Sequence, residues 1–265
     1  MRLTINHRTR YSFDDPVSFA LQQVRKTPKT GNGQQVVSWR TKVTGGRKEV
    51  SFTDHHNNLT ELISFDKDAQ SVELLSEGVV EIDDTNGIVG KHRGPAPLWL
   101  YLKPTPRTEA RAGVRELSKG IDLDDPLAAL HTLSARICTE IAYEIGASHA
   151  DWTAEDAVEA GRGVCQDHSH VFLACARRLG IPARYVSGYL MLNDRTTQEA
   201  MHAWAEAYVE GLGWVGFDVS NGISPDARYV RVATGLDYSD AAPVSGTRFG
   251  GSAETLEVMI DVAQQ

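Results

Sequence analysis

The chain has 265 residues, 41% of them hydrophobic and 23% charged, which is the composition of an ordinary globular protein with one large or two medium-sized domains. Its formal net charge of -8 argues against nucleic acid as a main partner, and no segment has the length and apolarity of a membrane span or a signal peptide. Three cysteines without the spacing of a disulfide framework indicate a reducing compartment, so we expect a cytoplasmic protein with no membrane partner.

Residues 1–105 carry a succession of short apolar segments with strand-like alternation and little helical periodicity. Turn residues separate these segments, and the pattern predicts an antiparallel, sandwich-like β domain that acts as a scaffold or covers the substrate. The stretch 95–106, rich in proline and aromatic residues, marks the crossing to a second domain. The predicted strands are centred on residues 3–7, 36–39, 50–52, 62–65 and 72–75.

Residues 106–265 predict an α+β domain whose core spans about 124–235. One helix is expected to begin with Asp125 as its cap and Pro126 at its first position. Glycines make 246–252 a predicted loop, and the alternation over 254–262 predicts a closing strand that returns to the sheet of either domain. Further helices are predicted after 153 and from 165, with strands around 185–190, 202–208 and 214–218.

Cys165 lies where a loop with two glycines turns into a predicted helix. The apolar run 171–179 continues this helix, which Gly180 and Pro182 end. A residue in the first helical turn has unpaired backbone N–H groups beside it, and the helix dipole there favours negative charge. Helix N-termini therefore favour the thiolate form of a cysteine, and Cys165 is the candidate nucleophile.

Two segments downstream provide a base for this thiol. The alternating run from His202 to 209 predicts a strand, the glycines around 211–213 a turn, and the run from 214 to Asp218 a returning strand. Antiparallel pairing brings His202 and Asp218 to the same end of this hairpin. The carboxylate can then orient the imidazole and leave its other nitrogen for Cys165, which gives a Cys-His-Asp triad.

Four motifs support this interpretation together. Gly-Val-Cys-Gln-Asp at 163–167 is followed by Gly-Ile-Pro-Ala-Arg-Tyr-Val-Ser-Gly-Tyr at 180–189, His-Ala-Trp at 202–204 and Gly-Trp-Val-Gly-Phe-Asp at 213–218. In this order they resemble the bacterial transglutaminase-like superfamily. The resemblance implies a papain-like α+β core after an N-terminal β domain, with the triad on Cys165, His202 and Asp218. His168 and Val219 depart from the family pattern, where an aromatic residue and a proline are common.

The tetrahedral anion of acyl transfer needs hydrogen-bond donors. The backbone N–H of Cys165 is one, and the Gln166 side chain, a neighbouring amide or the Trp152 indole could be the second; Trp152 could instead pack before the helix that follows it. His168 and Trp204 are candidates for the pocket wall, although strand aromatics such as Trp204 more often belong to the core.

A metal site formed by Cys165, His168 and His170 is the alternative for this motif. His170 lies well around the helix from the other two, and no second pair of ligands completes a tetrahedral set. We therefore expect no metal and no cofactor. Cys138 and Cys175 fit apolar helical patterns and are expected to be buried, unreactive thiols.

The sequence thus predicts cysteine-dependent acyl transfer on the amide bond of a peptide, protein or small amide through a thioester. Hydrolysis by a peptidase or amidase is favoured because no amine-binding site is recognisable. Transamidation of protein glutamine and a non-catalytic interaction module are the alternatives, and the sequence does not define the oligomeric state.

Overall fold

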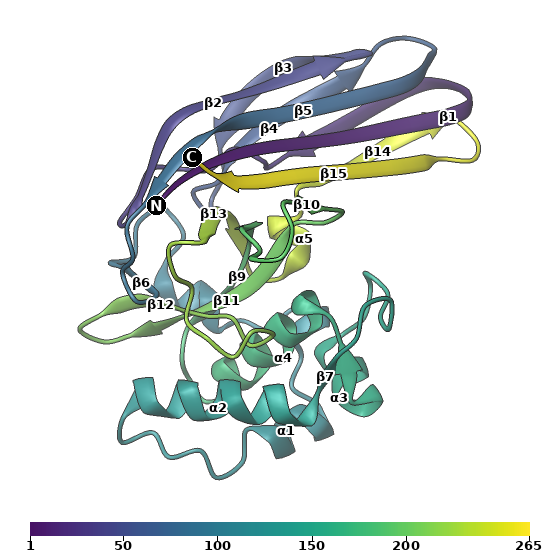
Figure 1. The fold of residues 1–265 in the computed structure, drawn as a ribbon. Helices are drawn as coiled ribbons and strands as arrows, with labels where there is room; N and C mark the ends of the chain where they lie inside the picture. Colours follow the sequence, from purple (N-terminus) through teal and green to yellow (C-terminus); the bar gives the residue numbers. More distant parts are fainter.

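Three layers make up the protein, which the computed structural model describes over residues 1–265 (Figure 1). A large antiparallel sheet forms one layer, a five-stranded sheet lies below it, and a group of helices covers the far side of the smaller sheet. The predicted fold class, an α+β protein with an N-terminal antiparallel β region, is confirmed.

The longest strand, β1 (Arg2–Val24), runs through the centre of the large sheet. Buried and more exposed residues alternate along its first half, because a strand with one face on the core buries every second side chain. Its register shifts between Ser12 and Val17, so the two halves have different neighbours. These are β5 (Ala69–Ile82) and β15 (Thr255–Gln264) for the first half, and β4 (Leu59–Phe65) and β14 (Val244–Gly250) for the second; β2 (Gln34–Thr44) and β3 (Gly46–Thr53) pair with β5 and β4.

The C-terminal part of the chain returns to this large sheet. The closing strand predicted over 254–262 is β15, which also pairs with the two-residue strand β10 (Thr197–Gln198). The loop predicted over 246–252 is wrong for most of its length, because β14 pairs with residues 17–24 of β1. Glycines at 246, 250 and 251 suggested a loop, whereas a partner strand far away in the sequence determines the conformation here.

The smaller sheet has the order β13-β9-β11-β12-β6 and is antiparallel throughout. Every residue of its second strand, β9, is buried, since the sheet lies between two other layers. The strand β6 comes from the first 105 residues, so both sheets contain strands from both sides of the predicted domain boundary. The strands are β6 (Ile88–Gly90), β9 (Ala183–Leu190), β11 (His202–Val209), β12 (Gly213–Phe217) and β13 (Tyr229–Gly235).

Side-chain caps mark the start of three helices, at Asp125, Thr153 and Asp237. α2 (Pro126–Glu140) starts after Asp125, whose side chain accepts the N–H groups of Leu127 and Ala128, as the sequence predicts. No helix is both long and apolar enough to cross a membrane. The other elements are α1 (Ala112–Leu117), α3 (Ala154–Ala160), α4 (Cys165–Arg178), α5 (Tyr238–Ala241), the 3-10 turns Leu98–Leu102 and Pro106–Thr108, and the short strands β7 (Ala142–Tyr143) and β8 (Arg162–Gly163).

One hydrophobic core of 35 buried residues joins the large sheet to the rest of the molecule. Leu3 and Ile5 of β1 belong to it together with Phe172 of α4. Cys175 is buried, as predicted, whereas Cys138 is exposed. The helical period explains why Cys138 is exposed, because Ile137 faces the core and Cys138 lies about 100° further around the helix.

Candidate active site

Cys165 is the first residue of α4, and buried polar contacts hold the start of this helix in place. One oxygen of Asp167, Oδ2, accepts the backbone N–H of Val164 at 2.8 Å and the Ser148 hydroxyl at 2.6 Å. The thiol of Cys165 is half-buried, and its backbone N–H belongs to the first turn, where the helix itself supplies no acceptor. The site therefore has a half-buried thiol beside a free backbone donor.

The hairpin of β11 and β12 carries the other two predicted residues. His202 is the first residue of β11, and Asp218 directly follows β12. Their side chains meet with 2.6 Å between His202 Nε2 and Asp218 Oδ2. Cys165 lines the same cavity as His202 and its charge acts on the imidazole; with Nε2 engaged by the carboxylate, Nδ1 is the nitrogen left for the thiol. Cys165, His202 and Asp218 thus form one connected group.

The charges of this group favour an imidazolium ion. Burial works against a charged His202, but hydrogen bonds to Asp218 and Cys165 outweigh it and raise the pKa of His202 to about 10. Burial likewise works against the Asp218 carboxylate, yet its hydrogen bonds, that with His202 first among them, hold its pKa below the usual value. The arrangement is that of a proton-bearing imidazole between two acidic groups.

Two residues that the sequence analysis did not single out complete the surroundings of Asp218. Oδ2 also accepts the Tyr229 hydroxyl at 2.7 Å and the Asn221 side-chain amide at 2.7 Å. Asn221 lies three residues after Asp218 and donates its backbone N–H to Oδ1, a local turn pattern that the sequence could have suggested. Tyr229 comes from β13, and no local signal in the sequence links it to the site.

Trp204 packs beside the imidazole. Its ring is stacked on that of His202 at 28° with 6.2 Å between centroids, and it meets the Tyr229 ring edge-on at 5.5 Å. Trp204 is buried in a small cluster with Val186 and Leu190. The indole therefore restricts the orientation of His202 from the core side.

His168 is buried one turn into α4, and both of its ring nitrogens have protein partners. Nε2 donates to the Ile141 carbonyl at 2.9 Å, so Nδ1 accepts the Ser220 hydroxyl at 3.1 Å. Ser220 lies in the loop that follows Asp218. His168 thus ties the carboxylate loop to the helix that carries the nucleophile.

The remaining candidates are placed around the start of α4. Gln166 lines a cavity beside Cys165, and its side-chain amide donates to the Ala150 carbonyl at 3.2 Å. Trp152 is half-buried against the main core just before α3. His170 is fully buried, its Nε2 accepts the Tyr238 backbone N–H at 3.2 Å, and burial lowers its pKa to about 3.

Cys165 and His202 lie at the junction of two hollows. One is an open groove of about 650 Å³, bordered by Tyr143 and Ile145 on one side and by the segment between β9 and β11 on the other. The second is a cavity of about 300 Å³ that extends from Cys165 to the large sheet. A substrate carbonyl at the sulfur therefore has room for chemical groups in two directions.

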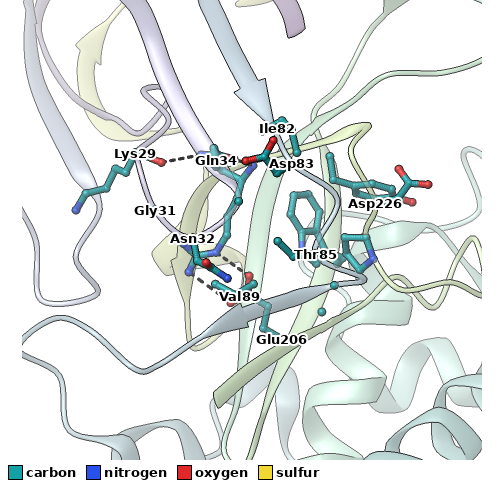
Figure 2. A pocket seen from close by; sticks show the side chains of 17 residues that line it. Lys29, Gly31, Asn32, Gln34, Ile82, Asp83, Thr85, Val89, Glu206 and Asp226 are labelled. Atoms are coloured by element: carbon teal, nitrogen blue, oxygen red, sulfur yellow. Dashed lines mark hydrogen bonds and ion pairs between the residues drawn. The ribbon is translucent and has the colours of Figure 1, made fainter. Parts of the chain in front are cut away.

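A third hollow lies at the seam between the two sheets and does not include Cys165 or His202 (Figure 2). Gln34 crosses this seam, since its side-chain amide donates to the carbonyls of Lys29 and Arg231, each at 2.8 Å. Glu206 lines the same hollow and is fully buried, paired with Arg184 and Arg231. The Gln34–Arg231 bond joins the small sheet to the N-terminal region, and the Glu206 ion pairs join three strands within the small sheet.

A cysteine at a helix start with a histidine and an acid on a hairpin is the arrangement expected of a thiol acyl-transfer site. Comparison with known proteins agrees: residues 115–219 match the Transglutaminase-like superfamily, and residues 3–81 match the Bacterial transglutaminase-like N-terminal region. Both regions of the chain thus match transglutaminase-like family models, and the predicted family resemblance is confirmed.

Relatives of similar length exist in mycobacteria. An uncharacterized protein of Mycobacterium leprae is 28% identical over 99% of this chain and 99% of its own, and one of Mycobacterium tuberculosis is 27% identical over 98% and 92%. Among solved structures, "a Putative Cysteine Protease from Cytophaga hutchinsonii" has a TM-score of 0.78 at 21% identity, covering 100% of this chain and 91% of that one. At this identity the similarity establishes the shared fold.

Proposed function

We propose that the protein is a cysteine amidase or peptidase that hydrolyses an amide bond through a thioester on Cys165. The observation that carries this proposal is the position of His202, which hydrogen-bonds Asp218 and lies with Cys165 at the same cavity. An imidazole held between a thiol and a carboxylate can take a proton from the first while the second stabilises the resulting cation.

The reaction then has two stages. The Cys165 sulfur attacks the amide carbonyl, the backbone N–H of Cys165 stabilises the oxyanion, and His202 gives its proton to the departing amine. This breaks the C–N bond and leaves a thioester. His202, now neutral, takes a proton from water, which attacks the thioester and releases the acid with return of the proton to the Cys165–His202 pair.

Hydrolysis is favoured over amine transfer by the surroundings of the sulfur. Cys165 is half-buried and lines the open groove, so water has access to a thioester formed there. Transfer to an amine requires that water be excluded or outcompeted by a specifically bound acceptor. Incorporation of a primary amine is the competing outcome that the experiment below measures.

The test follows cleavage of peptide and isopeptide libraries by mass spectrometry, with a fluorescent primary amine present. Cleavage that depends on Cys165, with acid products, supports the proposal. Cys165→Ala should abolish it with an unchanged melting temperature. Amine-tagged products on uncleaved libraries would replace hydrolysis with transamidation, and no turnover of either kind would leave a non-catalytic module.

The reactivity of the Cys165 thiol provides a second test. Cys138 is exposed and would also react with the reagent, so it is replaced in this experiment. In a Cys138→Ser background, iodoacetamide should label Cys165 much faster than the buried Cys175, whose pKa burial raises to about 12. Equal, slow labelling of both thiols would contradict an activated nucleophile.

A further inference from the structure

The cavity behind Cys165 contains a lysine with no acidic partner. Lys26 follows the end of β1, its side chain is 0% exposed, and it lines the same cavity as Cys165 and His202. Its ammonium group donates to the Thr9 hydroxyl and forms no ion pair. Charged lysines are almost never fully buried unless they are paired, so this position requires an explanation.

The polar groups around Lys26 form a closed chain that leaves donors unused. The Tyr189 hydroxyl donates to the Lys26 carbonyl and faces His7 Nδ1 at 3.1 Å, so Nδ1 carries the proton there. His7 Nε2 then accepts the Thr9 hydroxyl at 3.1 Å, and the Thr9 oxygen accepts from Lys26. This direction requires a neutral His7, and burial, aided by the positive charge of Lys26, holds its pKa well below the usual value. An ammonium group has three donors, and Thr9 takes one.

The rest of the cavity is mostly apolar. Val244, Leu256 and Val258 of the large sheet belong to its wall. Glu199 borders it with an exposed side chain. A ligand that fits such a space has an aliphatic segment and a negatively charged end, because a charge-assisted hydrogen bond would satisfy the remaining donors of Lys26.

We propose that this cavity selects amide substrates that carry a carboxylate, with Lys26 binding the carboxylate and the apolar walls holding a short aliphatic segment between it and the reacting carbonyl. The proposal rests on the proposed function of Cys165. Burial lowers the pKa of Lys26 to about 7 in the empty cavity, and a bound carboxylate would restore the preference for the ammonium form. Lys26 is thus a specificity-determining residue contributed by the N-terminal region.

The test compares two thiol reagents on the Cys138→Ser protein. N-ethylmaleimide is neutral, whereas maleimides with an N-carboxyalkyl arm of two to five methylenes place a carboxylate at graded distances from the sulfur. Their rates are normalised to those with a small free thiol. We expect the best carboxylate reagent to label Cys165 about 10-fold faster than N-ethylmaleimide, the effect of one added charged hydrogen bond.

Lys26→Met should remove this preference, since methionine keeps the length and apolar stem without the charge. Lys29→Met is the matched control, because Lys29 is also partly buried but lines the separate hollow at the seam, and it should keep the preference. Glu199→Gln should increase the preference for the carboxylate reagent, because it removes a negative charge from the border of the cavity. An equal preference in folded Lys26→Met and in the parent protein would overturn the proposal.

A protection experiment on protein that retains Lys26 covers the case in which Lys26→Met does not fold. Glutarate should slow labelling by N-ethylmaleimide more than the neutral glutaramide does, and equal protection by the two compounds would also overturn the proposal. Slow labelling of Cys165 by every reagent, including the neutral one, would instead contradict the proposed nucleophile. The two failures are therefore distinguishable.

Discussion

Asp218 receives hydrogen bonds from three side chains on one oxygen, which makes the position of the carboxylate independent of any single partner. The imidazole in turn has a carboxylate on one side, a thiol on the other and an indole against its face. Each of these contacts contributes differently to charge and to orientation, so substitutions can separate the two effects.

Tyr229→Phe removes one donor from Asp218 and keeps the ring that contacts Trp204. Burial raises the pKa of Asp218, but its hydrogen bonds lower it by more, so loss of a donor should raise that pKa. The acid limb of kcat/KM set by Asp218 then moves to higher pH by about one unit. A pH-rate profile measures this shift. Tyr208→Phe, on the same sheet but away from the site, is the control, and coincident acid limbs would refute the assignment.

The raised pKa of His202 predicts a dependence of stability on pH. A group whose pKa is higher in the folded than in the unfolded state stabilises the protein fully below its unfolded value of 6.5 and loses this effect as the pH rises through about 10. The free energy of unfolding should therefore fall across this window by a few kcal/mol more in the parent than in His202→Gln. Urea titrations of both proteins at several pH values test it; parallel curves would contradict it.

At the scale of elements, the start of α4 sets the position of the nucleophile. Gly163 in β8 precedes the helix, and a Cβ built there lies 2.7 Å from Cβ and 2.8 Å from Oδ2 of Asp167. Since Asp167 is buried and bonded to Val164 and Ser148, it has little room to move. The close approach of Gly163 to Asp167 therefore requires a glycine at this position.

Gly163→Ala should destabilise the protein by about 1–3 kcal/mol through overpacking and lower the activity by displacing Cys165. Thermal unfolding and the labelling rate of Cys165 measure the two effects. Gly31→Ala is the control, because nothing lies within 4 Å of a Cβ at that position. A stable, fully reactive Gly163→Ala protein would show that the helix start tolerates the shift.

Sequence patterns predicted the elements that depend on local signals. Cys165 at a helix start and the His202–Asp218 hairpin could be located from loop glycines, the apolar run of the helix and the alternation of the strands. Contacts between distant segments could not: Lys26 reaches the cavity from the end of β1, and Ser220 meets His168 across 52 positions. The strand β14 was missed for the same reason, since only its pairing with β1 places this glycine-containing segment in the sheet.

At the scale of the whole molecule, the two sheets share one core and exchange strands, so the N-terminal region is part of the folding unit. Val80 and Ile82 of β5 lie in the same buried cluster as Tyr185 of β9. A fragment of residues 83–265 would expose this surface and leave β15 without β1. We expect the fragment to show no cooperative thermal transition by calorimetry under conditions in which the full chain does. A cooperative transition in the fragment would demonstrate an independent catalytic domain.

The return of β15 to the large sheet has a consequence for biosynthesis. Leu256 and Val258 on this strand form part of the wall of the cavity next to Cys165, and β15 pairs with the very first strand of the chain. During translation, the ribosome has already released the segment with the thiol long before it makes these residues. A nascent chain therefore has its sulfur before it has the complete cavity, which forms only when β15 has been made and has paired with β1.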